Sequence, residues 1–170
     1  YIMTAVKSGL LVVDQHRAHV RVLYERFMRQ LEKRNAPSQR VLFPEIVALS
    51  AEEEGTLQAI NDDLSALGFD LTSLGGGSYA INGTPAGLDG LNIVKLLQEI
   101  IASVGSTAKE SVNSVIAERM AKSAAITYGE ILEEKEMEQL IADLFLCSNV
   151  NYTPSGKKIT VIIDDIESRL

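Results

Sequence analysis

The sequence predicts an α+β fold, and three observations carry this prediction. Apolar residues make up 46% of the 170 residues and charged residues 23%, which is the composition of a globular chain and not of a disordered one. Apolar side chains recur in some segments with the short period of strands and in others with the 3.6-residue period of helices. The resulting order of elements, ββα, βαββα and ααβ, is typical of the α+β class.

A hairpin and a long helix are expected at the start of the chain. Residues 2–6 and 10–13 are β-branched or aliphatic runs separated by Lys7-Ser8-Gly9, which favours two strands joined by a turn. From residue 15 to about residue 34, apolar side chains recur at helical spacing. The apolar face of this helix consists of Val20, Leu23, Tyr24, Phe27 and Leu31. The cations outside that face, which we expect to be solvated, are Arg21, Arg26, Arg29 and Lys33.

An extended segment and a second helix follow. Residues 35–38 break the first helix, and residues 41–47 can form an extended segment around Pro44. Ser50 and Glu53 have the spacing of a capping box, in which a hydroxyl and a carboxylate satisfy opposite free amides at a helix start. The helix that they open therefore begins next to residue 51.

That second helix is followed by another hairpin. Its apolar residues at positions 57, 60, 64 and 67 share one face, and Gly68 is expected to end it. Strands at 69–74 and 78–81 flank Gly75-Gly76-Gly77. These glycines lack the spacing and the following Lys-Ser/Thr of a phosphate-binding loop, so a tight turn is the preferred interpretation.

Three more helices and a last strand complete the predicted order. The helices span residues 91–104, with Asp89 as the cap, residues 107 to about 128, with Thr107 and Glu110 as a capping box, and residues 133–146. A polar loop at 148–158 then leads to a strand at 159–163.

Charge and cysteine content narrow the class of protein. A net charge of −7 repels a phosphate backbone on average, so the domain is not expected to be a principal DNA binder. The single Cys147 cannot form an internal disulfide, which suits a reducing cytoplasm. No apolar run reaches the length of a membrane span, so no membrane partner is expected. The chain has no initiator methionine and reads as part of a longer protein.

The most informative stretch runs from Leu11 to Glu25. A strand that ends at Asp14 and a helix that starts near His16 would project an acid and an imidazole from one corner, where a metal ion could bind. The alternative is that Asp14 simply caps the helix, which acids do far more often. Nucleophilic catalysis is disfavoured, because the sequence has only two histidines, His16 and His19, placed on one helix.

This stretch resembles the start of the C-terminal domain of the MutL mismatch-repair family. Nuclease-competent members carry Asp-Gln-His-Ala, two residues, Glu, four residues, Glu. The present sequence keeps Asp14, Gln15, His16 and Glu25 but has Arg17 for the alanine and Val20 for the first glutamate. The similarity continues through Leu-Phe-Pro-Glu at 42–45, the acidic helix start at Ser50, the triple-glycine turn and the alanine-rich helix, and so covers nearly the whole chain.

The departures weaken the implied nuclease site. Residues four apart share a helix face, so position 20 is the natural ligand partner of His16, whereas Glu25 lies on the opposite face. Two other nuclease segments resemble residues 121–123 and 153–157 here, where the thiols and the second imidazole that select zinc are missing. No catalytic residue is therefore assigned, and Asp14 with His16 remains as a remnant metal site.

In an alternative function, the remnant metal site still binds an ion and is catalytically active. It is a metal-dependent DNA-nicking endonuclease that uses Asp14 and His16, with Glu25 or an acid from Asp164-Asp165, and manganese or zinc. The preferred interpretation has no cofactor in this fragment, with ATP and magnesium in the preceding ATPase part.

A sliding-clamp motif is intact. Gln39, Leu42, Phe43 and Pro44 fit the Gln-x-x-Leu-x-Pro pattern by which the family is thought to dock on the replication sliding clamp. In such docking Gln39 makes polar contacts, Leu42 and Phe43 fill an apolar pocket, and Pro44 limits the entropy lost on ordering. The alternative is that Leu42 and Phe43 are ordinary core residues.

The resemblance implies a homodimer with two lobes. We expect a dimerisation lobe from residues 1–38 and 109–170 and an inserted outer, regulatory lobe from residues 39–108. The dimer would tether two N-terminal ATPase domains and meet the sliding clamp and other mismatch-repair proteins in the cytoplasm, with DNA bound mainly through the full-length protein. A dimerising adaptor unrelated to repair is a third interpretation.

Overall fold

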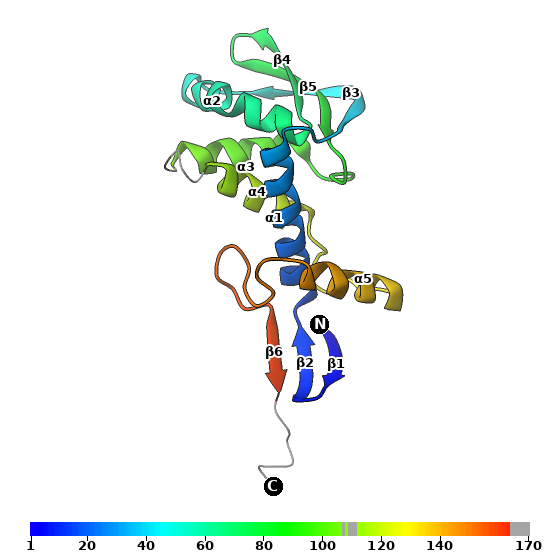
Figure 1. Ribbon diagram of the computed structural model, residues 1–170. Coiled ribbons are helices and arrows are strands. Elements are labelled where there is room, and N and C mark those ends of the chain that lie inside the picture. Colours follow the sequence, from blue (N-terminus) through cyan, green and yellow to red (C-terminus); the bar gives the residue numbers. More distant parts are fainter. Residues whose placement is uncertain (107, 109–111, 164–170) are drawn as a thin grey trace. The chain divides into compact units, whose positions relative to one another are not determined.

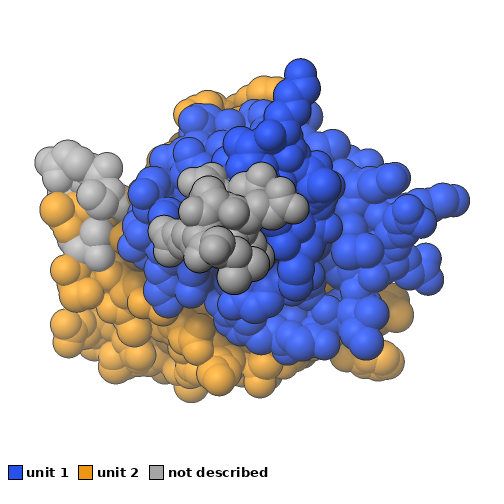
Figure 2. All heavy atoms as spheres, turned by 90° about the horizontal axis from the view of Figure 1, so that it is seen from below, with its two compact units in different colours: residues 1–25, 125–170 blue, residues 26–124 orange. Residues whose placement is uncertain are grey.

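The computed structural model describes residues 1–106, 108 and 112–163. In this part of the chain, five helices and two three-stranded antiparallel sheets confirm the predicted α+β class (Figure 1). The chain has two compact units, one from Tyr1–Glu25 with Ala125–Leu170 and one from Arg26–Ala124 (Figure 2). These bounds differ from those of the predicted lobes, whose assignment to dimerisation and regulation stays a prediction.

The first unit is built on a sheet of order β1-β2-β6. Its strands are β1 (Ile2–Val6), β2 (Gly9–Val13) and β6 (Thr160–Ile163), so the predicted hairpin is confirmed and the last strand begins one residue late. The start of α1 (Gln15–Lys33) and all of α5 (Glu134–Phe145) belong to this unit. One sheet face packs into a core of Ile2, Val13, Ala18, Leu140, Leu144 and Ile159.

The second unit contains the other sheet, of order β3-β5-β4. Its strands are β3 (Ser38–Ala48), β4 (Asp70–Gly75) and β5 (Ser78–Pro85), and its other helices are α2 (Ala51–Leu67), α3 (Ile93–Gly105) and α4 (Val112–Ala124). The Tyr79 hydroxyl donates to Glu54 of α2 over 2.8 Å, which fastens this helix to the sheet. Because β4 pairs with β5 and α2 begins directly after Ser50, the second predicted hairpin and the predicted helix start are confirmed.

Local chemistry sets both ends of α2. Ser50 and Glu53 form the predicted capping box, with the Glu53 carboxylate accepting from the Ser50 amide over 2.8 Å. Gly68 ends the helix in the left-handed region at φ 103°. A Cβ at this position would also lie 2.6 Å from the Pro37 carbonyl oxygen, so only glycine fits.

The caps and ends of α3 and α4 and the burial of one α1 arginine differ from the sequence predictions. Asn92, not Asp89, caps α3, because the Asn92 side chain accepts from the Lys95 amide over 2.9 Å. Helix α4 ends at Ala124 and not near Tyr128, and its predicted capping box at Thr107 and Glu110 lies outside the described residues. Arg21 is buried, whereas Arg26, Arg29 and Lys33 are exposed as expected.

Among the described residues, no helix is both long and apolar enough to cross a membrane.

Candidate functional site

Asp14 lies at the corner where β2 ends and α1 begins, and its carboxylate caps the helix. Oδ1 accepts from the Arg17 amide over 2.9 Å, and Oδ2 lies 3.3 Å from the Arg17 Nε. The side chain is almost fully buried, at 6% exposure. Arg17, at the position where the resemblance expects an alanine, thus supplies both an amide and a cation to Asp14, and the predicted capping contact of this acid is present.

His16 and His19 hold one peptide segment between them. The Nδ1 atom of His16 lies 2.7 Å from the Ile126 carbonyl oxygen, and because a carbonyl can only accept, Nδ1 carries the proton. The Ile126 amide in turn donates to Nδ1 of His19 over 3.0 Å. The His16 ring also packs on Tyr128, with 4.2 Å between ring centroids. Both imidazoles are therefore engaged in positioning the chain after α4.

The two remaining positions of the motif face different surroundings. Val20 is buried at 2% exposure, as its place on the apolar face predicts. Glu25 accepts from the Ser148 amide over 3.0 Å and from the Ser148 hydroxyl over 2.7 Å, and its Oε1 lies 3.6 Å from Arg21 Nη1. Position 20 is core, and the Glu25 carboxylate fixes the loop that starts at Ser148.

Residues 153–157, which sequence analysis compared with a nuclease segment of the family, form a self-contained turn. Thr153 is buried, its amide donates to the Lys157 carbonyl over 2.8 Å, and its hydroxyl accepts from the Lys157 amide over 3.0 Å. Gly156 supplies the required positive φ of 79°. In the second unit, Ala121 is buried in α4 and Lys122 pairs with Glu118.

The donors at the α1 corner do not fit a metal site. Within the described ranges, no group of three or more His, Cys, Asp and Glu side chains could hold an ion, and the acids Asp164 and Asp165 lie outside those ranges. The Asp14 carboxylate already accepts from the Arg17 amide, and the bond of His16 to the Ile126 carbonyl occupies Nδ1 and leaves only Nε2 as a nitrogen that could bind an ion. We therefore derive no metal-dependent step, and the nicking endonuclease stays a prediction that metal analysis of the purified chain would test.

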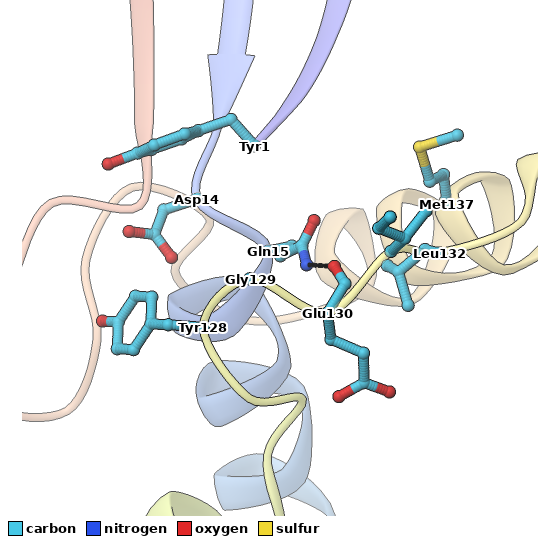
Figure 3. Close-up of a pocket in the computed structure, with 9 residues that line it drawn as sticks. Tyr1, Asp14, Gln15, Tyr128, Gly129, Glu130, Leu132 and Met137 are labelled. Carbon is cyan, nitrogen blue, oxygen red and sulfur yellow. Dashed lines mark hydrogen bonds between the residues drawn. The ribbon is translucent and has the colours of Figure 1, made fainter.

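A pocket of about 530 Å³ opens beside this corner. Figure 3 shows Asp14 and Tyr128 on one side of it and Leu132 and Met137 on the other. Gln15, the second residue of the motif, lies between them and donates through Nε2 to the Glu130 carbonyl oxygen. The motif residue that sequence analysis left without a role thus ties the start of α1 to the loop before α5.

Sequence analysis missed the two arginines that organise this corner. The Arg17 guanidinium donates to the Lys158 carbonyl over 2.8 Å, and Arg21 donates through Nε over 2.8 Å and through Nη2 to the Tyr152 carbonyl. A signal was present in the sequence: two bases, Arg17 and Arg21, lie between two acids, Asp14 and Glu25, at spacings that share a helix face. That spacing could have indicated a buried ion-pair row.

The outer face of the β1-β2-β6 sheet is the face opposite to the core. Among the residues that are paired between these strands, those on the outer face are all apolar. Residues paired across the ladder point to the same face, and the face opposite to the core contains Met3, Ala5, Leu10, Val12, Val161 and Ile163. Five of these six are exposed and Val12 is partly exposed, with Met3 reaching 63%. A small sheet with an exposed apolar face opposite its core has one face more than its own core uses.

The predicted clamp motif lies on the surface of the second unit. Leu42 and Phe43 are 90% and 85% exposed, so the alternative that they are core residues is wrong. The pairing of β3 with β5 breaks between Arg40 and Glu45, which frees this segment from the regular ladder. Pro44 and Gln39 are also exposed, and Gln39 Nε2 donates to Asp89 over 3.1 Å.

Residues 1–132 match the family described as the MutL C terminal dimerisation domain. Similar curated proteins from Bacteroides fragilis, Phocaeicola vulgatus and Parabacteroides distasonis, all named DNA mismatch repair protein MutL, are 49%, 48% and 45% identical to this chain. Each alignment covers 98% of this chain. The chain spans only 27% to 28% of the length of these relatives.

Proposed function

The chain belongs to the family of MutL C-terminal dimerisation domains, and from this premise we propose that two copies pair through the outer face of the β1-β2-β6 sheet. The observation that carries the proposal is the unbroken apolar composition of that face. Monomeric proteins rarely leave such a surface in water, and burying it against the same surface of a second copy gives a closed two-fold contact.

The experiment exploits two neighbouring residues of β6. Val161 lies on the outer face and Ile162 on the opposite one, yet they are almost equally exposed, at 45% and 49%. We expect Val161→Lys to convert the dimer to a monomer in sedimentation velocity, because a charge would be buried in the contact. Ile162→Lys is the matched control and should remain dimeric. Wild-type protein that sediments as a monomer at micromolar concentration would contradict the proposal.

The purpose of pairing would be tethering. In the arrangement that the family implies, an N-terminal ATPase domain precedes each copy of this chain, and one dimer joins two such domains. Their association then becomes effectively intramolecular, at a local concentration set by the linkers. We propose that the domain serves DNA mismatch repair in this way, as an assembly module in the cytoplasm that also meets other mismatch-repair proteins.

We also propose that Gln39, Leu42, Phe43 and Pro44 dock the replication sliding clamp. The support is the exposure of two adjacent large apolar side chains on a segment that has left its ladder. Exposed apolar residues of this kind can act as anchors that fill a pocket on a partner. Gln39 would exchange its bond to Asp89 for a polar contact on the clamp.

Binding of purified clamp, measured by surface plasmon resonance, tests this docking. The double variant Leu42→Ala with Phe43→Ala should weaken binding by more than about tenfold, because truncating an anchor typically costs 2 kcal/mol or more. Leu74→Ala removes another exposed apolar side chain from the same sheet, and this control should bind as wild type does. Equal affinity of the double variant and wild type would leave the motif without a role.

A further inference from the structure

Three cations line the exposed face of the second half of α1. Arg26, Arg29 and Lys33 are three and seven residues apart, so they lie within about 60° of one another around the helix axis. All three are exposed, and all belong to the second unit. We call this set the α1 basic face.

The charge of the α1 basic face is not neutralised within the described part of the chain. Three other cations of the same unit are in ion pairs, Arg34 with Asp63, Lys95 with Glu99 and Lys122 with Glu118, whereas Arg40 and Arg119 are in no ion pair between described residues. No such pair involves the three cations of the basic face. The guanidinium of Arg26 lies 5.3 Å from the ring centroid of Phe27, and partial desolvation lowers the pKa of Arg26 from its ordinary value. An anionic ligand would compensate for this desolvation.

The surroundings of the basic face indicate the class of ligand. No large apolar side chain of α1 between residues 26 and 33 is exposed, so this stretch of the helix offers no anchor of the kind that supplies most of the energy of protein–protein contacts. Interfaces with nucleic acid are instead polar and basic, and arginine forms paired hydrogen bonds with phosphate. A surface with cations and no apolar anchor therefore fits a phosphate backbone better than it fits an acidic protein.

We propose that the α1 basic face binds the phosphate backbone of duplex DNA without sequence preference. The net charge of −7 repels DNA on average, so this local patch acts only at short range, and binding is weak and sensitive to salt. With three phosphate contacts, the logarithm of the binding constant should fall with the logarithm of salt at a slope of about −2.7, or about forty-fold between 50 and 200 mM.

Fluorescence anisotropy of a labelled 20-base-pair duplex with the 170-residue chain measures this slope. Arg26→Gln, Arg29→Gln and Lys33→Gln should each reduce its magnitude by about 0.9, whereas Arg29→Lys should retain it. The matched controls, Lys95→Gln and Lys122→Gln, remove the same unit of charge from paired cations of the same unit and should leave the slope unchanged.

Three outcomes would overturn the inference. Controls that reduce the slope as much as the three variants would show that net charge and not this face governs binding. Competition by polyglutamate as strong as by unlabelled duplex at equal charge would assign the face to an acidic protein. Wild-type protein that fails to bind the duplex at low salt would exclude the interaction. None of these outcomes depends on whether the outer sheet face pairs two copies.

Discussion

At the scale of single residues, four charged side chains lie along one side of α1, beginning at the corner where the sequence predicted a remnant metal site. Asp14 and Arg17 form one pair, Arg21 and Glu25 another, and both arginines donate to carbonyls of the loop before β6. The Nε of Arg17 has its ion pair but no hydrogen bond. Removing one member of such a row leaves a partly buried charge without its partner, so the four side chains depend on one another.

Arg21 should be the most sensitive member of this row. Arg21→Met removes both donors to the Tyr152 carbonyl and leaves Glu25 without its cation, so we expect unfolding free energy to fall by about 2–4 kcal/mol. Chemical denaturation measures the loss. Arg29→Met, an exposed position on the same helix, is the control and should change stability by less than about 0.5 kcal/mol. Similar losses at both positions would show that the buried row has no special role.

At the scale of elements, local signals predicted both ends of α2 but neither the cap of α3 nor the end of α4. The α2 start follows from Ser50 and Glu53, which lie three residues apart, and sequence alone could place it. The end of α4 could not be read locally, because the Ile126 peptide is bonded by His16 and His19, more than 100 residues earlier. The motif at the α1 corner was likewise visible in sequence, whereas its partners, carbonyls and amides of distant loops, were not.

The capping box makes α2 sensitive to acid. The backbone amide and then the hydroxyl of Ser50 hold the pKa of Glu53 below its ordinary value of 4.5. A lowered folded-state pKa means that the stabilisation is present above pH 4.5 and is lost as pH falls through the folded-state value. Thermal melts across this acidic range should therefore depend less on pH in Glu53→Gln than in wild type. Glu52→Gln, in the same turn but outside the cap, should keep the wild-type dependence, and parallel curves for Glu53→Gln and wild type would refute the assignment.

At the scale of the whole molecule, the proposed pairing face needs both ends of the described chain. Strands β1 and β2 come from its first residues and β6 from its last, and Val12 meets Val161 only because β6 joins the edge of β2. The row of charges on α1 holds the loop that delivers β6 to that edge. The corner that retains only part of a nuclease motif thereby supports the surface proposed for self-association.

Pairing through this face links stability to concentration. A dimer that dissociates on unfolding gains about 1.4 kcal/mol for each tenfold increase in protein, which for two 170-residue chains raises Tm by about 2 °C. Differential scanning calorimetry from 1 to 100 µM should show this rise in wild type and in Ile162→Lys. Val161→Lys should melt at a temperature independent of concentration, because its two copies no longer meet. If wild type also melts independently of concentration, the outer sheet face does not bind a second copy over this range.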